Sequence, residues 1–103
     1  MITVIIPALN EEATIDFVVR LAMQSVNVTE VIVVDDKSMD NTVATARQAG
    51  ATVITSTKLG KGASMKDGVL VTKNNIIVFL DADITTYPSN IIALLTDPIL
   101  QGS

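Results

Sequence analysis

Two aspartates directly follow a continuous apolar run in this sequence. Residues 76–80 read IIVFL, and Asp81 and Asp83 come next, one residue apart. On an extended backbone, side chains at i and i+2 point to the same side, so we expect the two carboxylates to face one ligand. Carboxylate oxygens suit hard divalent cations such as Mg²⁺ and Mn²⁺. Alone, this pair is a weak signal, because many strands end in two solvated carboxylates.

A second acidic pair and a lysine between glycines add to this signal. Asp35 and Asp36 follow the apolar residues 31–34, and Lys61 is the centre of the sequence GKG. Neighbouring carboxylates repel one another unless a cation or a hydrogen-bond donor lies between them. A nucleoside diphosphate with a bound metal ion supplies both, so a nucleotide is a ligand that fits these residues.

The elements that position these residues alternate between strand and helix. Ile15, Val18, Val19 and Ala22 follow the i, i+3, i+4, i+7 spacing of an amphipathic helix. Alternation of this kind predicts a doubly wound parallel sheet, in which ligands bind at the carboxyl ends of the strands. We predict strands at residues 2–6, 31–34, 51–55 and 76–80. Pro7 is expected to stop the first strand, and the last one is expected to be buried on both faces. The predicted helices are one after an Asn10 N-cap, with Glu11 and Glu12 in its first turn, one at 41–49 capped by Gly50, one at 63–71, and a last one with Pro88 in its first turn.

Composition excludes several classes of function. The 103 residues contain no cysteine and no histidine, so disulfides, thiol-bound metals and imidazole catalysis are excluded. The formal net charge of −4 argues against a nucleic-acid surface, which needs a basic patch. No apolar run has the length of a membrane span. A protein without cysteine fits a reducing compartment, so we expect a cytoplasmic location, and peripheral membrane attachment of a full-length protein stays open.

Four segments, in this order, resemble the nucleotide-diphospho-sugar glycosyltransferases of the GT-A fold. They are VIIPALNEEATI, VIVVDDKSMDNT, GKGASMKDGV and IIVFLDADI. The set is most similar to family 2, of the dolichyl-phosphate-mannose-synthase type, and to glucosyl- and mannosyl-3-phosphoglycerate synthases. Each motif alone is weak, whereas four in one order are specific. The resemblance implies a Rossmann-like, mainly parallel sheet that forms a truncated GT-A fold.

The resemblance also implies a donor site at the matching positions. The loop after the first strand contacts the base and ribose, Asp36 accepts a hydrogen bond from the base, and Lys61 lies near the pyrophosphate. Leu9 stands where many relatives have an aromatic residue. The implied donor-binding residues are Pro7, Leu9, Glu11, Val34, Asp35, Asp36, Lys61, Asp81 and Ala82.

The aspartate pair supplies metal ligands under the same resemblance. Asp83 is implied as the direct ligand of Mg²⁺ or Mn²⁺, and Asp81 as a contact to ribose or to metal-bound water. Thr85 stands where some relatives have a further ligand. The cation then neutralises the charge that develops on the departing nucleoside diphosphate.

We expect residues 1–103 to be the N-terminal nucleotide-sugar-binding portion of a glycosyltransferase domain. In the family, the acceptor pocket and any general base follow the aspartate pair, so we expect both beyond Ser103. No catalytic residue is therefore identified. The chain is expected to bind a UDP- or GDP-sugar without turning it over by itself, and the acceptor is not specified.

Two alternatives stay open at this point. A receiver-like module also gathers an acidic pair and a later aspartate around Mg²⁺, and Asp35, Asp36 and Asp81 fit that arrangement in part. A non-catalytic fragment could instead self-associate through an exposed sheet edge, because an unpaired edge strand is a template for another strand.

Overall fold

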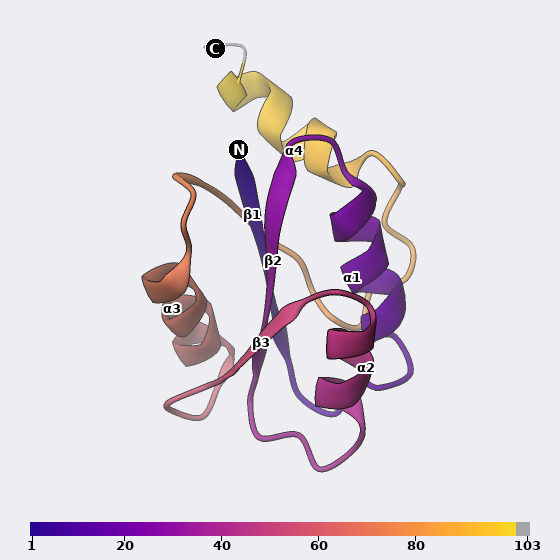
Figure 1. Ribbon diagram of the computed structural model, residues 1–103, viewed down its shortest axis with the longest axis vertical. Helices are drawn as coiled ribbons and strands as arrows, with labels where there is room; N and C mark the ends of the chain where they lie inside the picture. Colours follow the sequence, from indigo (N-terminus) through magenta and orange to yellow (C-terminus); the bar gives the residue numbers. More distant parts are fainter. Residues whose placement is uncertain (101–103) are drawn as a thin grey trace.

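A computed structural model describes residues 1–100 as one parallel sheet with helices on both of its faces (Figure 1). The elements are β1 (Ile2–Ala8), α1 (Ile15–Gln24), β2 (Val28–Asp35), α2 (Thr42–Gln48), β3 (Thr52–Thr55), α3 (Lys61–Val71), β4 (Ile76–Phe79) and α4 (Ile91–Leu100). The strand order is β3-β2-β1-β4, and all three pairings are parallel. The predicted doubly wound α/β fold is therefore confirmed.

The helices divide the core into two layers of unequal size. In Figure 1, α1 and α2 cover one face of the sheet, and α3 covers the other. The larger core lies under α1 and α2 and includes the four helix residues predicted to be apolar contacts: Ile15, Val18, Val19 and Ala22. The smaller core, under α3, consists of Ile5, Ile32 and Val34 with partly buried neighbours. Gly68 brings α3 close to this second face, since a Cβ at this position would lie 2.6 Å from Ile5 Cγ2.

Strand β1 lies in the middle of the sheet and continues past Pro7, so the prediction that Pro7 stops this strand is wrong. The carbonyl of Ile5 accepts a hydrogen bond from Leu80 N–H, whereas the carbonyl of Ala8 accepts one from Asp36 N–H. Because successive residues alternate between the two neighbouring strands, Pro7 faces β4. That strand has already ended at Phe79. The missing N–H of proline therefore costs no ladder bond, and β1 reaches the carboxyl edge at Ala8.

Helix α1 begins at Ile15, so the predicted helix start after Asn10 is also wrong. Asn10 adopts a φ of 53°, which is left-handed, and its Oδ1 accepts a hydrogen bond from Met39 N–H at 2.8 Å. Thr14 occupies the N-cap position instead. Hydrogen bonds to the loop after β2 and to the first residue of α2 hold the N–H groups of residues 10–12, which keeps Glu11 and Glu12 out of the first helical turn.

Strand β4 is less buried than predicted. Only Val78 is buried within it, and Phe79 is 37% exposed. The reason is topological, because β1 is the only strand of the described residues that pairs with β4.

Pro88 lies before α4, which begins at Ile91, and not in its first turn as predicted. The Pro88 carbonyl accepts a hydrogen bond from Ile91 N–H at 3.0 Å. Gly50, by contrast, has the predicted left-handed conformation, with a φ of 110°.

None of the helices up to Leu100 combines the length and the apolar character that a membrane span needs.

Candidate functional site

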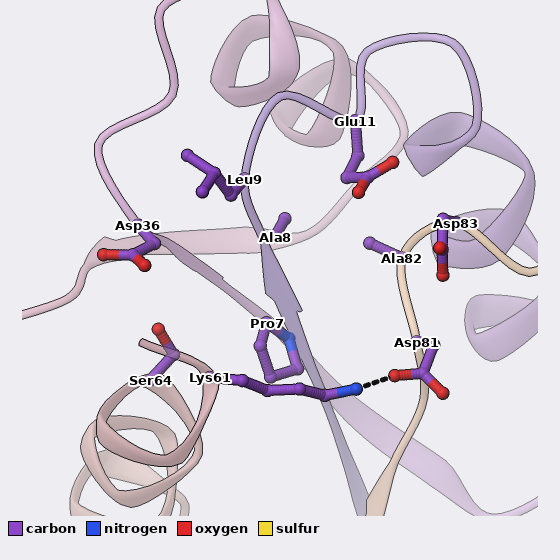
Figure 2. Close-up of a pocket in the computed structure, with 10 residues that line it drawn as sticks. All are labelled: Pro7, Ala8, Leu9, Glu11, Asp36, Lys61, Ser64, Asp81, Ala82 and Asp83. Carbon is purple, nitrogen blue, oxygen red and sulfur yellow. Dashed lines mark hydrogen bonds and ion pairs between the residues drawn. The ribbon is translucent and has the colours of Figure 1, made fainter. Parts of the chain in front are cut away.

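A cavity of about 230 Å³ opens at the carboxyl edge of the sheet (Figure 2). Its walls come from the end of β1 and the loop after it, the residue after β2, the first turn of α3 and the segment after β4. The lining residues are Pro7, Ala8, Leu9, Glu11, Asp36, Lys61, Ser64, Asp81, Ala82 and Asp83. All the predicted site residues except Val34 and Asp35 thus lie around one cavity.

Val34 and Asp35 lie behind the cavity wall. The Val34 side chain is fully buried in the core under α3, so it presents no side chain to a ligand. Asp35 is 4% exposed, and its Oδ2 accepts a hydrogen bond from Ser38 N–H at 3.1 Å. In this structure, Asp35 orders the loop after β2 and does not line the cavity, and its part in donor binding stays a prediction.

Asp36 connects β2 to the loop before α3. Its Oδ2 accepts a hydrogen bond from Gly60 N–H at 3.0 Å, and its buried Oδ1 has no hydrogen-bond partner among residues 1–100. Ser64, which the sequence analysis missed, also has a buried hydroxyl without a partner in that part of the chain. Its position three residues after Lys61 is a signal that could have identified it, since i and i+3 share one face of a helix.

Lys61 reaches across the floor of the cavity. It is the first residue of α3, and its side chain extends past Pro7 to Asp81 (Figure 2). Lys61 Nζ donates a hydrogen bond to Asp81 Oδ1 and forms an ion pair with it. The two side chains are 61% and 38% exposed, so water screens this pair and a ligand can displace it.

The segment from Asp81 to Asp83, here called the DAD turn, differs from the predicted extended backbone. The chain bends at Ala82 and Asp83, and Ile84 N–H points back to the carbonyl of Asp81 at 3.5 Å. Asp81 points to Lys61, whereas Asp83 lies on the Glu11 side of the cavity in Figure 2. Both carboxylates still line the cavity, but they approach it from different directions.

Negative charge dominates the cavity. Four carboxylates and one ammonium group line it. Burial raises the pKa of Glu11, and the nearby charges of Asp83 and Asp40 raise it further, although a hydrogen bond with Thr14 acts in the opposite direction. Burial and the charge of Asp83 likewise raise the pKa of Tyr87. A bound cation would relieve this repulsion.

Hydrogen bonds between the two loops hold Glu11 in place. Asn10 N–H donates to Ser38 Oγ at 2.9 Å, and Glu11 N–H donates to Thr42 Oγ1 at 2.8 Å. Thr42 is fully buried, so the backbone of Glu11 is fixed against a rigid part of α2. The loop after β1 thus presents its carboxylate from a preorganised position.

The carboxylate oxygens that line the cavity fit a hard cation that is bound together with a ligand. Asp81 and Asp83 offer carboxylate oxygens, but residues 1–100 contain no group of three or more acidic, histidine or cysteine residues that could hold a metal. Mg²⁺ is commonly bound by one or two carboxylates, with water and substrate phosphates completing its coordination. The cavity is suited to that mode of binding and not to an all-protein cage.

The open parallel sheet, with a cavity at its carboxyl edge, defines a Rossmann-like α/β protein. The family model described as Glycosyl transferase family 2 matches residues 3–97. This chain therefore belongs to glycosyltransferase family 2, as its motifs predicted.

Proteins of known function and structure resemble the chain over nearly its whole length. Glucosyl-3-phosphoglycerate synthase from Mycobacterium tuberculosis is 34% identical over 98% of this chain and 34% of its own length. The 4,4'-diaponeurosporenoate glycosyltransferase from Staphylococcus aureus is 36% identical, over 98% of this chain and 29% of its own length. The chain thus spans about a third of the length of these curated relatives.

Crystal structures of the mycobacterial synthase share the fold. The structure of its complex with Mn²⁺, UDP and glucosyl-3-phosphoglycerate matches all of this chain, and the match covers 40% of the synthase chain, with 34% sequence identity and a TM-score of 0.90. Its complex with Mg²⁺ and UDP matches with a TM-score of 0.92 and the same identity and coverage. The predicted GT-A fold is confirmed, and the predicted cations are those found in these related structures.

Proposed function

We propose that residues 1–103 supply the donor-binding portion of a glycosyltransferase that transfers a sugar from a UDP-sugar with the help of Mg²⁺ or Mn²⁺. The observation that carries this proposal is that one cavity at the carboxyl edge of the sheet gathers residues from four separate segments. Synthase structures that match the whole chain contain UDP or UDP-glucose and Mn²⁺. A UDP-sugar is therefore favoured over the GDP-sugar that the motifs also allowed.

The arrangement of the cavity supports a division of roles. Asp36 and Leu9 lie toward one end of it and Asp83 toward the other, with Lys61 crossing the floor between the ends (Figure 2). Base and ribose are assigned to Leu9 and Asp36 at the first end and to Glu11, which lies between that end and Asp83 (Figure 2). The buried, unpartnered Oδ1 of Asp36 would accept a hydrogen bond from the base.

The diphosphate is assigned to the end with Lys61 and the DAD turn. Asp83, which is exposed and lines the cavity, would hold the cation, and Asp81 would contribute a second oxygen once Lys61 turns to the phosphates. The cation, when bound, neutralises charge on the leaving diphosphate. Lys61 adds a point charge at the same place.

The acceptor is expected to bind outside this chain. The cavity is smaller than the ~300–1,000 Å³ typical of sites that enclose a whole ligand, so it fits a part of a donor–acceptor pair. We therefore expect donor binding without turnover. The receiver-like alternative is not favoured, because Asp35 bonds to Ser38 and does not face Asp81 across the cavity. Self-association through the sheet edges stays a prediction.

Calorimetric titration with UDP and with GDP, in Mn²⁺ and in EDTA, tests this function. We expect UDP to bind more tightly than GDP, and Mn²⁺ to strengthen UDP binding. Asp83→Asn should remove the Mn²⁺-dependent gain, because it removes the charge of the assigned metal ligand. Asp97→Asn is the matched control, since Asp97 is an exposed aspartate on α4 away from the cavity. Equal Mn²⁺ dependence in both variants would contradict the assignment.

A further inference from the structure

We propose that Thr14 and Tyr87 are positioning residues that fix the backbone of the DAD turn and so set where its carboxylates stand. Thr14 Oγ1 donates a hydrogen bond to the carbonyl of Ala82 at 2.7 Å, and Tyr87 Oη accepts one from Asp81 N–H at 2.9 Å. The two contacts reach the turn from segments on either side of it in the sequence. The inference rests on the proposed function of Asp81 and Asp83.

The Thr14 hydroxyl serves the DAD turn and not its own helix. Thr14 is the N-cap residue of α1, a position at which threonine commonly bonds to a backbone N–H of the first turn. Its side chain makes no such bond here: it donates to the carbonyl of Ala82, 68 residues away, and makes a longer contact of 3.5 Å to the Glu11 carbonyl. The next residue, Ile15, is fully buried, so Thr14 is anchored to the core and transmits that rigidity to the turn.

Tyr87 covers a backbone donor that the sheet leaves unpaired. The β4 ladder ends where Leu80 N–H bonds to the Ile5 carbonyl. The following N–H, of Asp81, points away from β1, because successive N–H groups of a strand alternate in direction. The Tyr87 hydroxyl accepts this bond, and the Tyr87 ring packs against the larger core.

Together the two contacts bracket residues 81 and 82, the two residues that precede Asp83. The N–H of Asp81 is bound on one side and the carbonyl of Ala82 on the other, and Ala82 itself is 4% exposed. These bonds restrain the backbone of residues 81 and 82, so the position of the Asp81 carboxylate depends mainly on its own side-chain torsions, and Asp83 directly follows the restrained segment. Groups that orient metal ligands in this way typically change metal affinity by about 10- to 100-fold when they are removed.

The test compares Thr14→Val and Tyr87→Phe with the conservative Thr14→Ser. In this chain, Mn²⁺ binding is measured by the loss of the free-ion electron paramagnetic resonance signal, and UDP binding by calorimetry in EDTA. We expect the first two variants to lose about 10- to 100-fold in Mn²⁺ affinity, while UDP affinity in EDTA stays within about twofold in Tyr87→Phe. Thr14→Val also removes the hydrogen bond between Thr14 and Glu11, so its UDP affinity is compared with that of Thr14→Ser. Thr14→Ser keeps the hydroxyl and should restore Mn²⁺ affinity.

Thr72→Val is the matched control for lost hydroxyl contacts. Thr72 Oγ1 bonds to Thr3 and Glu30 at the opposite edge of the sheet, so this variant removes comparable bonds without touching the turn. Wild-type Mn²⁺ affinity in Thr14→Val and Tyr87→Phe, or an equal loss in Thr72→Val, would overturn the inference.

Amide hydrogen exchange keeps this inference separate from the proposed function. Tyr87→Phe should accelerate exchange of the Asp81 amide, and Thr14→Val that of residues 82–84, relative to Thr72→Val. If the wild type binds no Mn²⁺, the proposed function fails and the exchange data alone decide whether the two side chains fix the turn. Unchanged exchange in both variants would overturn that claim.

Discussion

Replacing Lys61 by methionine should change the affinities for cation and nucleotide in opposite directions. Lys61 forms an ion pair with Asp81 when neither ligand is bound, so it competes with a cation for that carboxylate. Exposed ion pairs contribute about 0.2–1 kcal/mol, and both partners here are more than a third exposed. Freeing Asp81 should therefore raise the affinity for Mn²⁺ alone by about 1.4- to 5-fold.

The same substitution should weaken UDP binding in EDTA. A hydrogen bond to a charged group contributes about 1.5–3 kcal/mol, and because Lys61 is largely exposed we take the lower limit, which is about tenfold in affinity. Electron paramagnetic resonance measures Mn²⁺ binding, and calorimetry measures UDP binding.

Lys66→Met is the matched control for both measurements. Lys66 is an exposed lysine of α3 that does not line the cavity, so it reports the general effect of removing one positive charge. A fall in Mn²⁺ affinity in Lys61→Met, or identical results for the two variants, would refute the competition between Lys61 and the cation.

Two further predictions concern stability. Gly68→Ala places a Cβ 2.6 Å from Ile5 Cγ2, so it should lower the free energy of unfolding in urea by about 1–3 kcal/mol, and an unchanged midpoint would contradict this packing. Burial raises the pKa of Glu30, but hydrogen bonds from Lys73 N–H, Thr3 and Thr72 outweigh it and lower the pKa below 4.5. This stabilisation is present above pH 4.5 and is lost as pH falls through the folded-state pKa, so Glu30→Gln should reduce the acid sensitivity of unfolding.

Local patterns were enough to predict the framework of the molecule. Apolar runs identified all four strands, and the spacing of Ile15, Val18, Val19 and Ala22 identified the buried face of α1. These signals succeed because burial against one sheet imposes a fixed period on the sequence. The carboxyl-edge rule then brought most of the predicted site residues together, since parallel strands end at a common edge.

Several errors arose where residues distant in sequence form hydrogen bonds. Asn10 was predicted to be an N-cap, but it adopts a left-handed conformation and its Oδ1 accepts a hydrogen bond from Met39 N–H. Thr14 carried a recognisable signal, a threonine just before an apolar helix, yet nothing local pointed to its bond with Ala82. Tyr87 had no local signal at all. Such contacts depend on which loops meet at the sheet edge, and short-range patterns do not contain that information.

The site combines a fixed backbone with an exchangeable counter-ion. The hydrogen bonds between Thr14 and the Ala82 carbonyl and between the Asp81 N–H and Tyr87 restrain the backbone of the DAD turn without a ligand. Lys61 satisfies Asp81 through an exposed pair that costs little to break. An incoming cation and diphosphate can therefore replace one weak contact, with Lys61 moving to the phosphates and the cation to the carboxylates. The restrained backbone of the DAD turn and the easily displaced side chain of Lys61 would then both assist the binding of a negatively charged sugar donor in an acidic cavity.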